Sequence, residues 1–222
     1  MADRMMQHFD PSSFNHLTSR IAYLKSFLNF SSEDGAAIQR AKSLLSPAVP
    51  SVVDAVYQHL LSFDITAKHF VQQQPEENAP DSVAIAVEDL SVDHPNIQHR
   101  KDFLKTYLVK LVSNSDWSDT SPFWAYLDKV GQMHTGIAGF KHREKRPSVR
   151  VEYMHAAALL GVVEDIVLKA VLSADIDLTT MTTVLIAFNK LLWIQNDLFA
   201  RHYTVDLDAN TAPEGVAMVN GA

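Results

Sequence analysis

Residues 121–136 read Ser-Pro-Phe-Trp-Ala-Tyr-Leu-Asp-Lys-Val-Gly-Gln-Met-His-Thr-Gly, a pattern that predicts a short helix over about 121–134. The apolar face of this helix, at i, i+4, i+7 and i+11, consists of Phe123, Leu127, Val130 and His134. Gly131 leaves space beside the imidazole, and the helix stops just beyond it at Gly136. A histidine on an apolar face is either a core side chain with two hydrogen-bond partners or a ligand. This pattern leaves both interpretations open.

Apolar residues recur at helical spacing on both sides of this segment. Helices are predicted at about residues 14–29, 50–63, 65–72, 96–113, 121–134, 149–173 and 178–203. A further helix should start at Ser31, which has capping-box spacing to Asp34. With only 7 Gly and 9 Pro in 222 residues, the chain has few turn-forming residues. No segment has a convincing strand pattern, so we predict an all-α fold.

The predicted helices group into one domain over residues 14–203. Residues 1–13 are expected to form a flexible N-terminal arm, and residues 204–222 a disordered tail. An irregular linker is expected over 73–95. The basic run 141–146 is expected to be a solvated loop, whose charges can offset the carboxylates of an anionic cofactor nearby.

Composition excludes several classes of protein. The chain has no cysteine, which rules out disulfide scaffolds, thiolate zinc sites and iron–sulfur clusters. A net charge of −7 argues against a general nucleic-acid binder. No apolar run reaches the roughly 18 residues of a membrane span, and the N-terminus has no signal-peptide core. We therefore expect a cytoplasmic protein with neither nucleic acid nor membrane as a partner.

Other candidate groups are individually weak. Tyr57 lies in an apolar helical pattern and suits a core aromatic, while His99 shares a helix face with Phe103 and suits half-buried packing. Glu152 and His155 form a Glu-x-x-His pair of the kind found in di-iron bundles, but such sites need two pairs and two further Glu residues. An aromatic hydroxyl and two histidines on three different helices form a stronger signal together.

Two segments resemble the globin domain of protoglobins and globin-coupled sensors: Phe103-Leu104-Lys105-Thr106-Tyr107-Leu108, and residues 126–134, which end in Val-Gly-Gln-Met-His. The segments Asp54-Ala55-Val56-Tyr57 and 149–153 fit the same pattern. The resemblance spans about residues 20–203. It implies a globin-like fold of the protoglobin type with an extra N-terminal helix, and haem b as the cofactor.

The resemblance also assigns roles to four residues. It makes His134 the proximal iron ligand, Tyr57 the distal tyrosine and Phe103 the aromatic wall over the haem. His99, one turn before Phe103, falls where many globins carry a distal residue and is a candidate for binding iron directly. The family's distal Trp-Tyr pair is Val56-Tyr57 here, which makes the pocket less crowded.

The function implied by the resemblance is reversible binding of O2, CO and NO for gas sensing, storage or scavenging. One alternative is a haem enzyme acting on NO, peroxide or reactive nitrogen species, such as an NO dioxygenase or a peroxidase-like activity. Another is a haemless helical regulatory module. A homodimer through the last two long helices is also expected, because these helices carry more large apolar side chains than one wall of a haem pocket requires. These include Leu185, Phe188, Leu192, Trp193 and Phe199.

Overall fold

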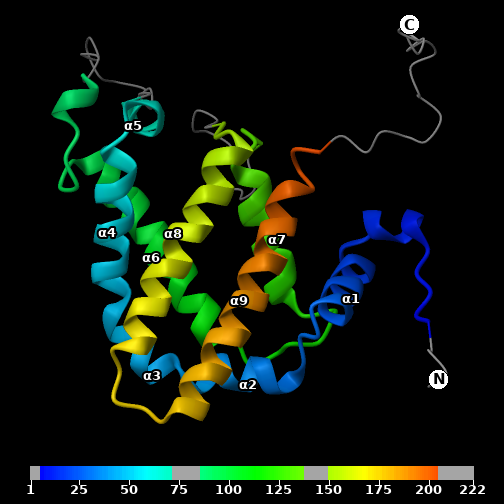
Figure 1. Ribbon diagram of the computed structural model, residues 1–222. Coiled ribbons are helices and arrows are strands. Elements are labelled where there is room, and N and C mark those ends of the chain that lie inside the picture. Colours follow the sequence, from blue (N-terminus) through cyan, green and yellow to red (C-terminus); the bar gives the residue numbers. More distant parts are fainter. Residues whose placement is uncertain (1–5, 72–85, 138–149, 205–222) are drawn as a thin grey trace, which may run out of the picture.

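The computed structural model describes residues 6–71, 86–137 and 150–204, and this part of the chain is helical (Figure 1). The α-helices are α1 (Leu17–Phe27), α2 (Ser32–Arg40), α3 (Lys42–Leu45), α4 (Val49–Leu61), α5 (Asp64–Val71), α6 (Pro95–Ser113), α7 (Pro122–Met133), α8 (Tyr153–Leu172) and α9 (Leu178–Ala200). Short 3-10 turns occupy Pro11–Asn15, Ser46–Ala48 and Val87–Asp89. Extended pairing within the described ranges is limited to one isolated bridge between Thr135 and Arg150. The all-α prediction is confirmed.

Several helices start where their capping residues predict. Ser31 and Asp34 form the expected capping box at the start of α2. The Ser121 hydroxyl accepts a hydrogen bond from the Phe123 backbone N–H, and Pro122 occupies the first position of α7. At the start of α9, the Asp177 carboxylate accepts from the backbone N–H of Thr180 at 2.9 Å. Local sequence is therefore sufficient to define these helix starts.

One helix boundary differs from the prediction. Helix α8 begins at Tyr153 rather than near residue 149, because the Val151 backbone N–H donates to the His134 carbonyl and holds that segment extended. In addition, a 3-10 turn over Pro11–Asn15, capped by Asp10, lies across the end of the segment expected to be a flexible arm. Predictions for residues 72–85, 141–146 and 205–222 fall outside the described residues.

Helix α9 lies at the centre of the packing. It contacts α2, α7 and α8, while α4 packs against α6. Figure 1 shows α4, α8 and α9 side by side, with α6 and α7 behind them and α2 and α3 at one end. Arg20 of α1 forms a bidentate ion pair with Asp197 of α9, which joins the N-terminal helix to the core. The layers enclose the space between α4, α6, α7 and α8.

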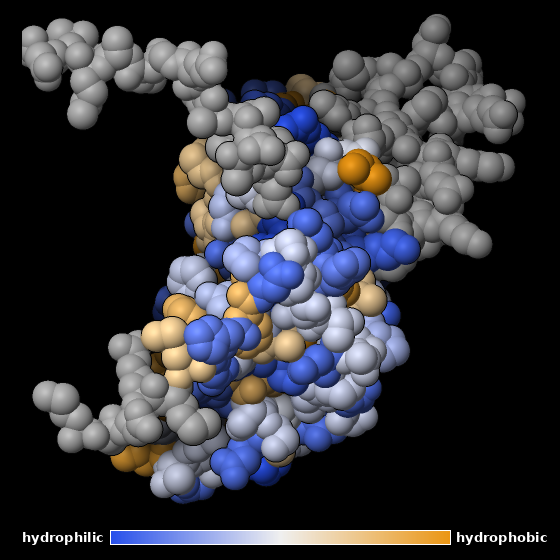
Figure 2. Space-filling model, turned by 90° about the vertical axis from the view of Figure 1, so that its right-hand side faces the viewer, coloured by the Kyte–Doolittle hydropathy of each residue, from blue (hydrophilic) through white to orange (hydrophobic). Residues whose placement is uncertain are grey.

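The surface beside α1 is mainly hydrophilic, with smaller hydrophobic patches between the polar residues (Figure 2). Within the described residues, no helix has the length and apolar character needed to cross a membrane.

Candidate functional site

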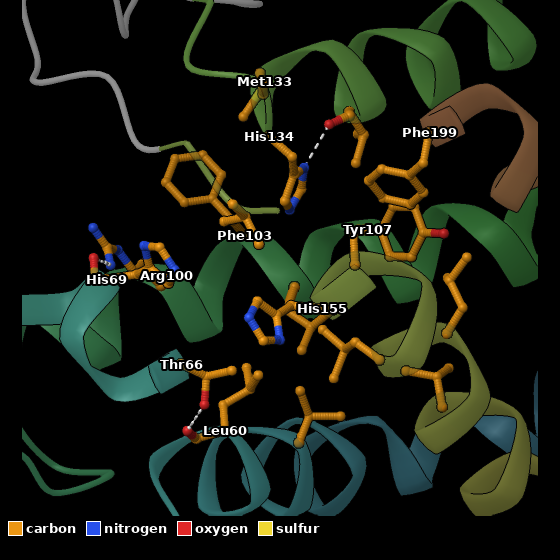
Figure 3. Close-up of a pocket in the computed structure, with 18 of the residues that line it drawn as sticks. Leu60, Thr66, His69, Arg100, Phe103, Tyr107, Met133, His134, His155 and Phe199 are labelled. Carbon is orange, nitrogen blue, oxygen red and sulfur yellow. Dashed lines mark hydrogen bonds between the residues drawn. The ribbon is translucent and has the colours of Figure 1, made fainter. Parts of the chain in front are cut away.

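Two cavities differ enough in size and chemistry to identify a candidate site. The larger has a volume of about 250 Å³, against about 40 Å³ for the smaller, which hydrocarbon and Phe188 side chains line. Helices α4 to α9 all contribute to the larger cavity (Figure 3). Most of its wall is apolar, and its polar side chains include Tyr57, His69, Arg100, Tyr107, His134 and His155. A mostly apolar cavity with a few polar groups is typical of a small-molecule site.

His134 is held in one orientation by the helix that carries it. It lies at the C-terminal end of α7, and its Nδ1 is 2.7 Å from the backbone carbonyl oxygen of Val130 (Figure 3). Because a carbonyl oxygen only accepts, Nδ1 carries the proton and donates, and the neutral ring has its lone pair on Nε2. The edge of the ring also meets Phe199 of α9, with ring centroids 5.0 Å apart. This is the tautomer needed for metal ligation through Nε2.

The backbone around His134 is equally constrained. A Cβ atom on Gly131 would lie 2.4 Å from the Leu198 carbonyl oxygen, so α7 and α9 approach each other as closely as they do only because residue 131 is glycine. After the helix ends, the His134 carbonyl accepts from the Val151 N–H at 2.8 Å. The imidazole is thus attached to a segment fixed on both sides.

The structure brings three of the four sequence-predicted site residues to the cavity. Tyr57 of α4 is buried and packs against Phe70, with ring centroids 5.8 Å apart, and Phe103 lines the cavity from α6. His134 lines it from α7. His99 is solvent-exposed and is not part of the lining, although its ring meets that of Phe103 edge-on at 4.9 Å.

Three basic side chains of the cavity were not assigned to it from the sequence: His69 of α5, Arg100 of α6 and His155 of α8. Arg100 Nη1 lies 3.4 Å from the His69 carbonyl oxygen, and its guanidinium is 5.0 Å from the centre of the Phe70 ring. His69 Nε2 and His155 Nε2 lie 3.4 and 3.9 Å from the same oxygen, Oε2 of Glu152. We call His69, Arg100 and His155 the polar end of the cavity.

The Glu-x-x-His pair of the sequence, Glu152 and His155, meets His69, which comes from a helix distant in the sequence. The pKa of the Glu152 carboxyl is lowered, chiefly by a hydrogen bond with its own backbone and further by the neighbouring His69 and His155. Among the described residues, no group of three or more His, Asp or Glu side chains is arranged to hold a bare metal ion. The di-iron alternative therefore has no support there.

A buried polar chain connects the cavity wall to α7. The Tyr107 hydroxyl donates to Gln195 Oε1 at 3.3 Å, and Gln195 Nε2 donates to the Leu127 carbonyl oxygen at 3.4 Å. Gln195 is fully buried, and burial raises the pKa of Tyr107 well above its ordinary value. These bonds connect α6, α9 and α7 beside the histidine.

The donor set of this cavity fits a haem. His134 offers one nitrogen from a backbone-fixed ring, so a metal bound there must bring its other donors with it, as a porphyrin does. The aromatic and aliphatic walls suit the flat hydrocarbon body of the macrocycle. His134 would hold such a group through Nε2, with Tyr57 and Phe103 elsewhere on the wall.

The all-helical fold and the fixed histidine beside a mostly apolar cavity are those expected of a globin. The Protoglobin family model matches residues 17–209, and the chain belongs to this family. The structure is similar to the globin domain of the Geobacter sulfurreducens globin-coupled sensor, at 18% identity and a TM-score of 0.62 over 83% of this chain and 97% of that one. No curated protein sequence matches the chain significantly. Membership of the family implies a haem cofactor.

Proposed function

We propose that this protein is a haem b protein that reversibly binds O2, CO and NO, with His134 as the proximal ligand. The observation that carries the proposal is the 2.7 Å contact from His134 Nδ1 to the Val130 carbonyl oxygen, which leaves the ring's lone pair on Nε2. The protoglobin family and the similarity to a sensor globin domain support the same assignment.

The side chains around the cavity have separate tasks in this proposal. Haem supplies an iron with one coordination position available to a diatomic ligand. His134 holds the cofactor and sets its orientation, and Phe103 and the aliphatic walls keep water out of the cavity. Tyr57 supplies a hydroxyl on the opposite helix, α4. Its hydrogen bond would favour a ligand with partial negative charge by about 1–3 kcal/mol over apolar CO.

The test is His134→Ala, followed by visible spectra of the ferric, ferrous and CO-bound protein. Without the axial nitrogen we expect loss of most bound haem, or a ferrous spectrum without the histidine-ligated form. His16→Ala is the matched control, because His16 is exposed and makes no side-chain cap bond. Full haem content with an unchanged ferrous spectrum in His134→Ala would contradict the proposal.

Two variants separate the candidate distal groups. Tyr57→Phe removes the hydroxyl of a buried ring that lines the cavity, and we expect the O2 dissociation rate to rise about fivefold to a hundredfold. His99→Leu changes an exposed side chain outside the lining, and the rate should stay unchanged. Stopped-flow kinetics measures the O2 dissociation rate of both variants. A rise in His99→Leu alone would make His99 the distal group in place of Tyr57.

We propose further that the protein is a homodimer through α8 and α9. Most of the apolar side chains on which the sequence-based expectation rests lie inside the protomer: Phe188, Leu192 and Phe199 are buried and Leu185 is partly buried, which leaves Trp193, 55% exposed. The support comes instead from the outer helix faces. Exposed positions recur at helical spacing on both: Met154, Ala158, Gly161, Asp165 and Leu168 on α8, and Thr182, Ile186, Asn189 and Trp193 on α9.

Light scattering tests the dimer. The wild-type protein should have the mass of a dimer at micromolar concentration. The double variant Ile186→Glu with Trp193→Glu should have the mass of a monomer, because the dimer would bury the two new charges without partners. Phe27→Glu, which changes an exposed apolar residue on α1, is the control and should remain dimeric. A monomeric wild-type protein would contradict this proposal.

A further inference from the structure

The larger cavity has a polar end whose purpose the His134 ligand does not explain. Figure 3 shows His69 and Arg100 beside each other on α5 and α6, with His155 of α8 also facing the cavity. The side chains of His69 and His155 are only 12% and 13% exposed. Nε2 of His69 is buried and has no hydrogen-bond partner within the described part of the chain. A buried polar atom without such a bond at a cavity wall indicates a position for a ligand group.

The chemistry of these side chains selects the kind of group. Arg100 carries a permanent positive charge and a planar set of donors that suits a carboxylate. Imidazoles can donate to a carboxylate through a ring N–H. The protein's own contacts illustrate this preference, because Oε2 of Glu152 lies within 4 Å of both imidazoles, although without hydrogen-bond geometry at His69. The polar end is thus suited to accept a carboxylate.

We infer that His69, Arg100 and His155 form a carboxylate subsite that binds the propionate groups of the haem. This inference rests on the proposed function, and it sets the orientation of the cofactor. Haem b is apolar except for two carboxylates on one edge, and the basic side chains of the cavity other than His134 lie at its polar end. Matching the two fixes which edge of the macrocycle faces α5 and the start of α8.

Glu152 then acts as a competitor for the subsite. Its side chain is 61% exposed, so its carboxylate can turn towards solvent when another carboxylate enters. A variant of Glu152 can therefore distinguish a role of the polar end in ligand binding from a purely structural role. If the subsite binds propionates, removal of the competing carboxylate should strengthen binding of the acid form of the cofactor alone.

The experiment compares haem with its dimethyl ester, in which both carboxylates are masked. Full-length apoprotein is titrated with each, and the dissociation constants are taken from the Soret absorbance. For the wild-type protein, we expect the ester to bind on the order of tenfold to a hundredfold more weakly than the acid. In Arg100→Gln this ratio should fall towards one, and in Arg100→Lys part of it should return.

Controls separate this effect from damage to the fold. Loss of the Arg100–Phe70 contact would weaken both cofactors alike and leave their ratio unchanged. Arg40→Gln, at an exposed position on α2, should keep the wild-type ratio. Glu152→Gln should tighten haem binding and leave ester binding unchanged.

The outcomes distinguish the two proposals. If the wild-type protein binds both cofactors equally, or if Arg100→Gln keeps the wild-type ratio, the subsite is disproved while the haem proposal stands. If it binds neither cofactor, both proposals are overturned.

Discussion

At the α7 side of the cavity, side chains are held by backbone groups and buried polar bonds, whereas at the polar end they surround one exposed carboxylate. His134 is bonded to the Val130 carbonyl and lies against Phe199. The His155 imidazole lies 3.9 Å from the carboxylate of Glu152, whose side chain is 61% exposed. The fold thus determines the orientation and hydrogen bonding of the His134 imidazole more completely than those of the His155 imidazole. The first suits a permanent ligand, and the second suits a group that changes partner when the cofactor arrives.

The largest effect should come from breaking the close approach that fixes the α7 side. In Gly131→Ala the new methyl group would meet the Leu198 carbonyl at 2.4 Å, and backbone cannot move aside as a side chain can. We expect a loss of about 2–3 kcal/mol, which for a domain of this size lowers Tm by roughly 4–12 °C. Thermal unfolding followed by circular dichroism measures it.

The matched control for Gly131→Ala is Gly161→Ala, because a Cβ at this helical position on α8 would meet nothing within 4 Å. Alanine favours the helix by up to about 1 kcal/mol over glycine, so Tm should stay or rise. Both variants are compared at one protein concentration, since Gly161 lies on the face proposed for the dimer. Equal shifts in the two variants would mean that the α7–α9 contact is not the constraint described above.

The contrast between the two ends also explains what sequence could predict. The α7 helix, its capping by Ser121 and the placement of His134 on an apolar face all follow from contacts between residues close in sequence. The position of His69 against Glu152 does not, because it depends on how α5 packs near the start of α8. Helix α8 is apolar over most of its surface, so periodicity gave no reason to direct His155 into the cavity.

The same limit accounts for His99. The sequence places His99 on one helix face with Phe103, and the two rings do meet across one helix turn, but His99 is exposed and not half-buried. Whether His99 or its neighbour Arg100 faces the cavity depends on the rotation of the whole helix α6 against α4. The structure turns Arg100 towards the cavity and leaves His99 exposed.

A smaller effect is expected from the buried bonds beside His134. Tyr107→Phe removes the hydroxyl that donates to Gln195 and leaves a buried amide oxygen without this donor. At pH 8 the cost should be about 1 kcal/mol in urea unfolding.

The pH dependence of this difference follows from the raised pKa of Tyr107. Its hydroxyl ionises at lower pH in the unfolded chain than in the folded protein, so its contribution is complete below about pH 10 and is lost as pH rises further. The stability advantage of the wild-type protein over Tyr107→Phe should therefore fall by about 1.4 kcal/mol per pH unit above pH 10 and be gone by about pH 11. Urea unfolding at pH 8 and 11, followed by circular dichroism, measures the gap. A constant gap would show that the hydroxyl is not buried as described.

The smallest effect on stability is expected from neutralising Glu152, the carboxylate at the polar end. Asp128, a carboxylate on α7, provides the comparison. Asp128 accepts from His202 at 2.9 Å and from Arg201 at 3.3 Å, and its side chain is 23% exposed. Asp128→Asn weakens both contacts and should cost about 1 kcal/mol of unfolding free energy. Glu152→Gln should leave the Tm at pH 7 unchanged, because contacts of a solvent-exposed carboxylate are screened by water.

The direction of the pKa shift of Glu152 determines the pH at which Glu152→Gln and Asp128→Asn should be compared. The lowered pKa of Glu152 means that any stabilisation from its carboxylate is present above its ordinary pKa of 4.5 and is lost as pH falls below that value. Any stabilisation from the Glu152 carboxylate is therefore present at pH 7, and the loss in Glu152→Gln is measured there. A loss in apoprotein Glu152→Gln as large as that in Asp128→Asn would mean that the polar end is fixed by the fold as firmly as α7. The carboxylate would then be a structural partner of His69 and His155, unable to yield its place to a propionate.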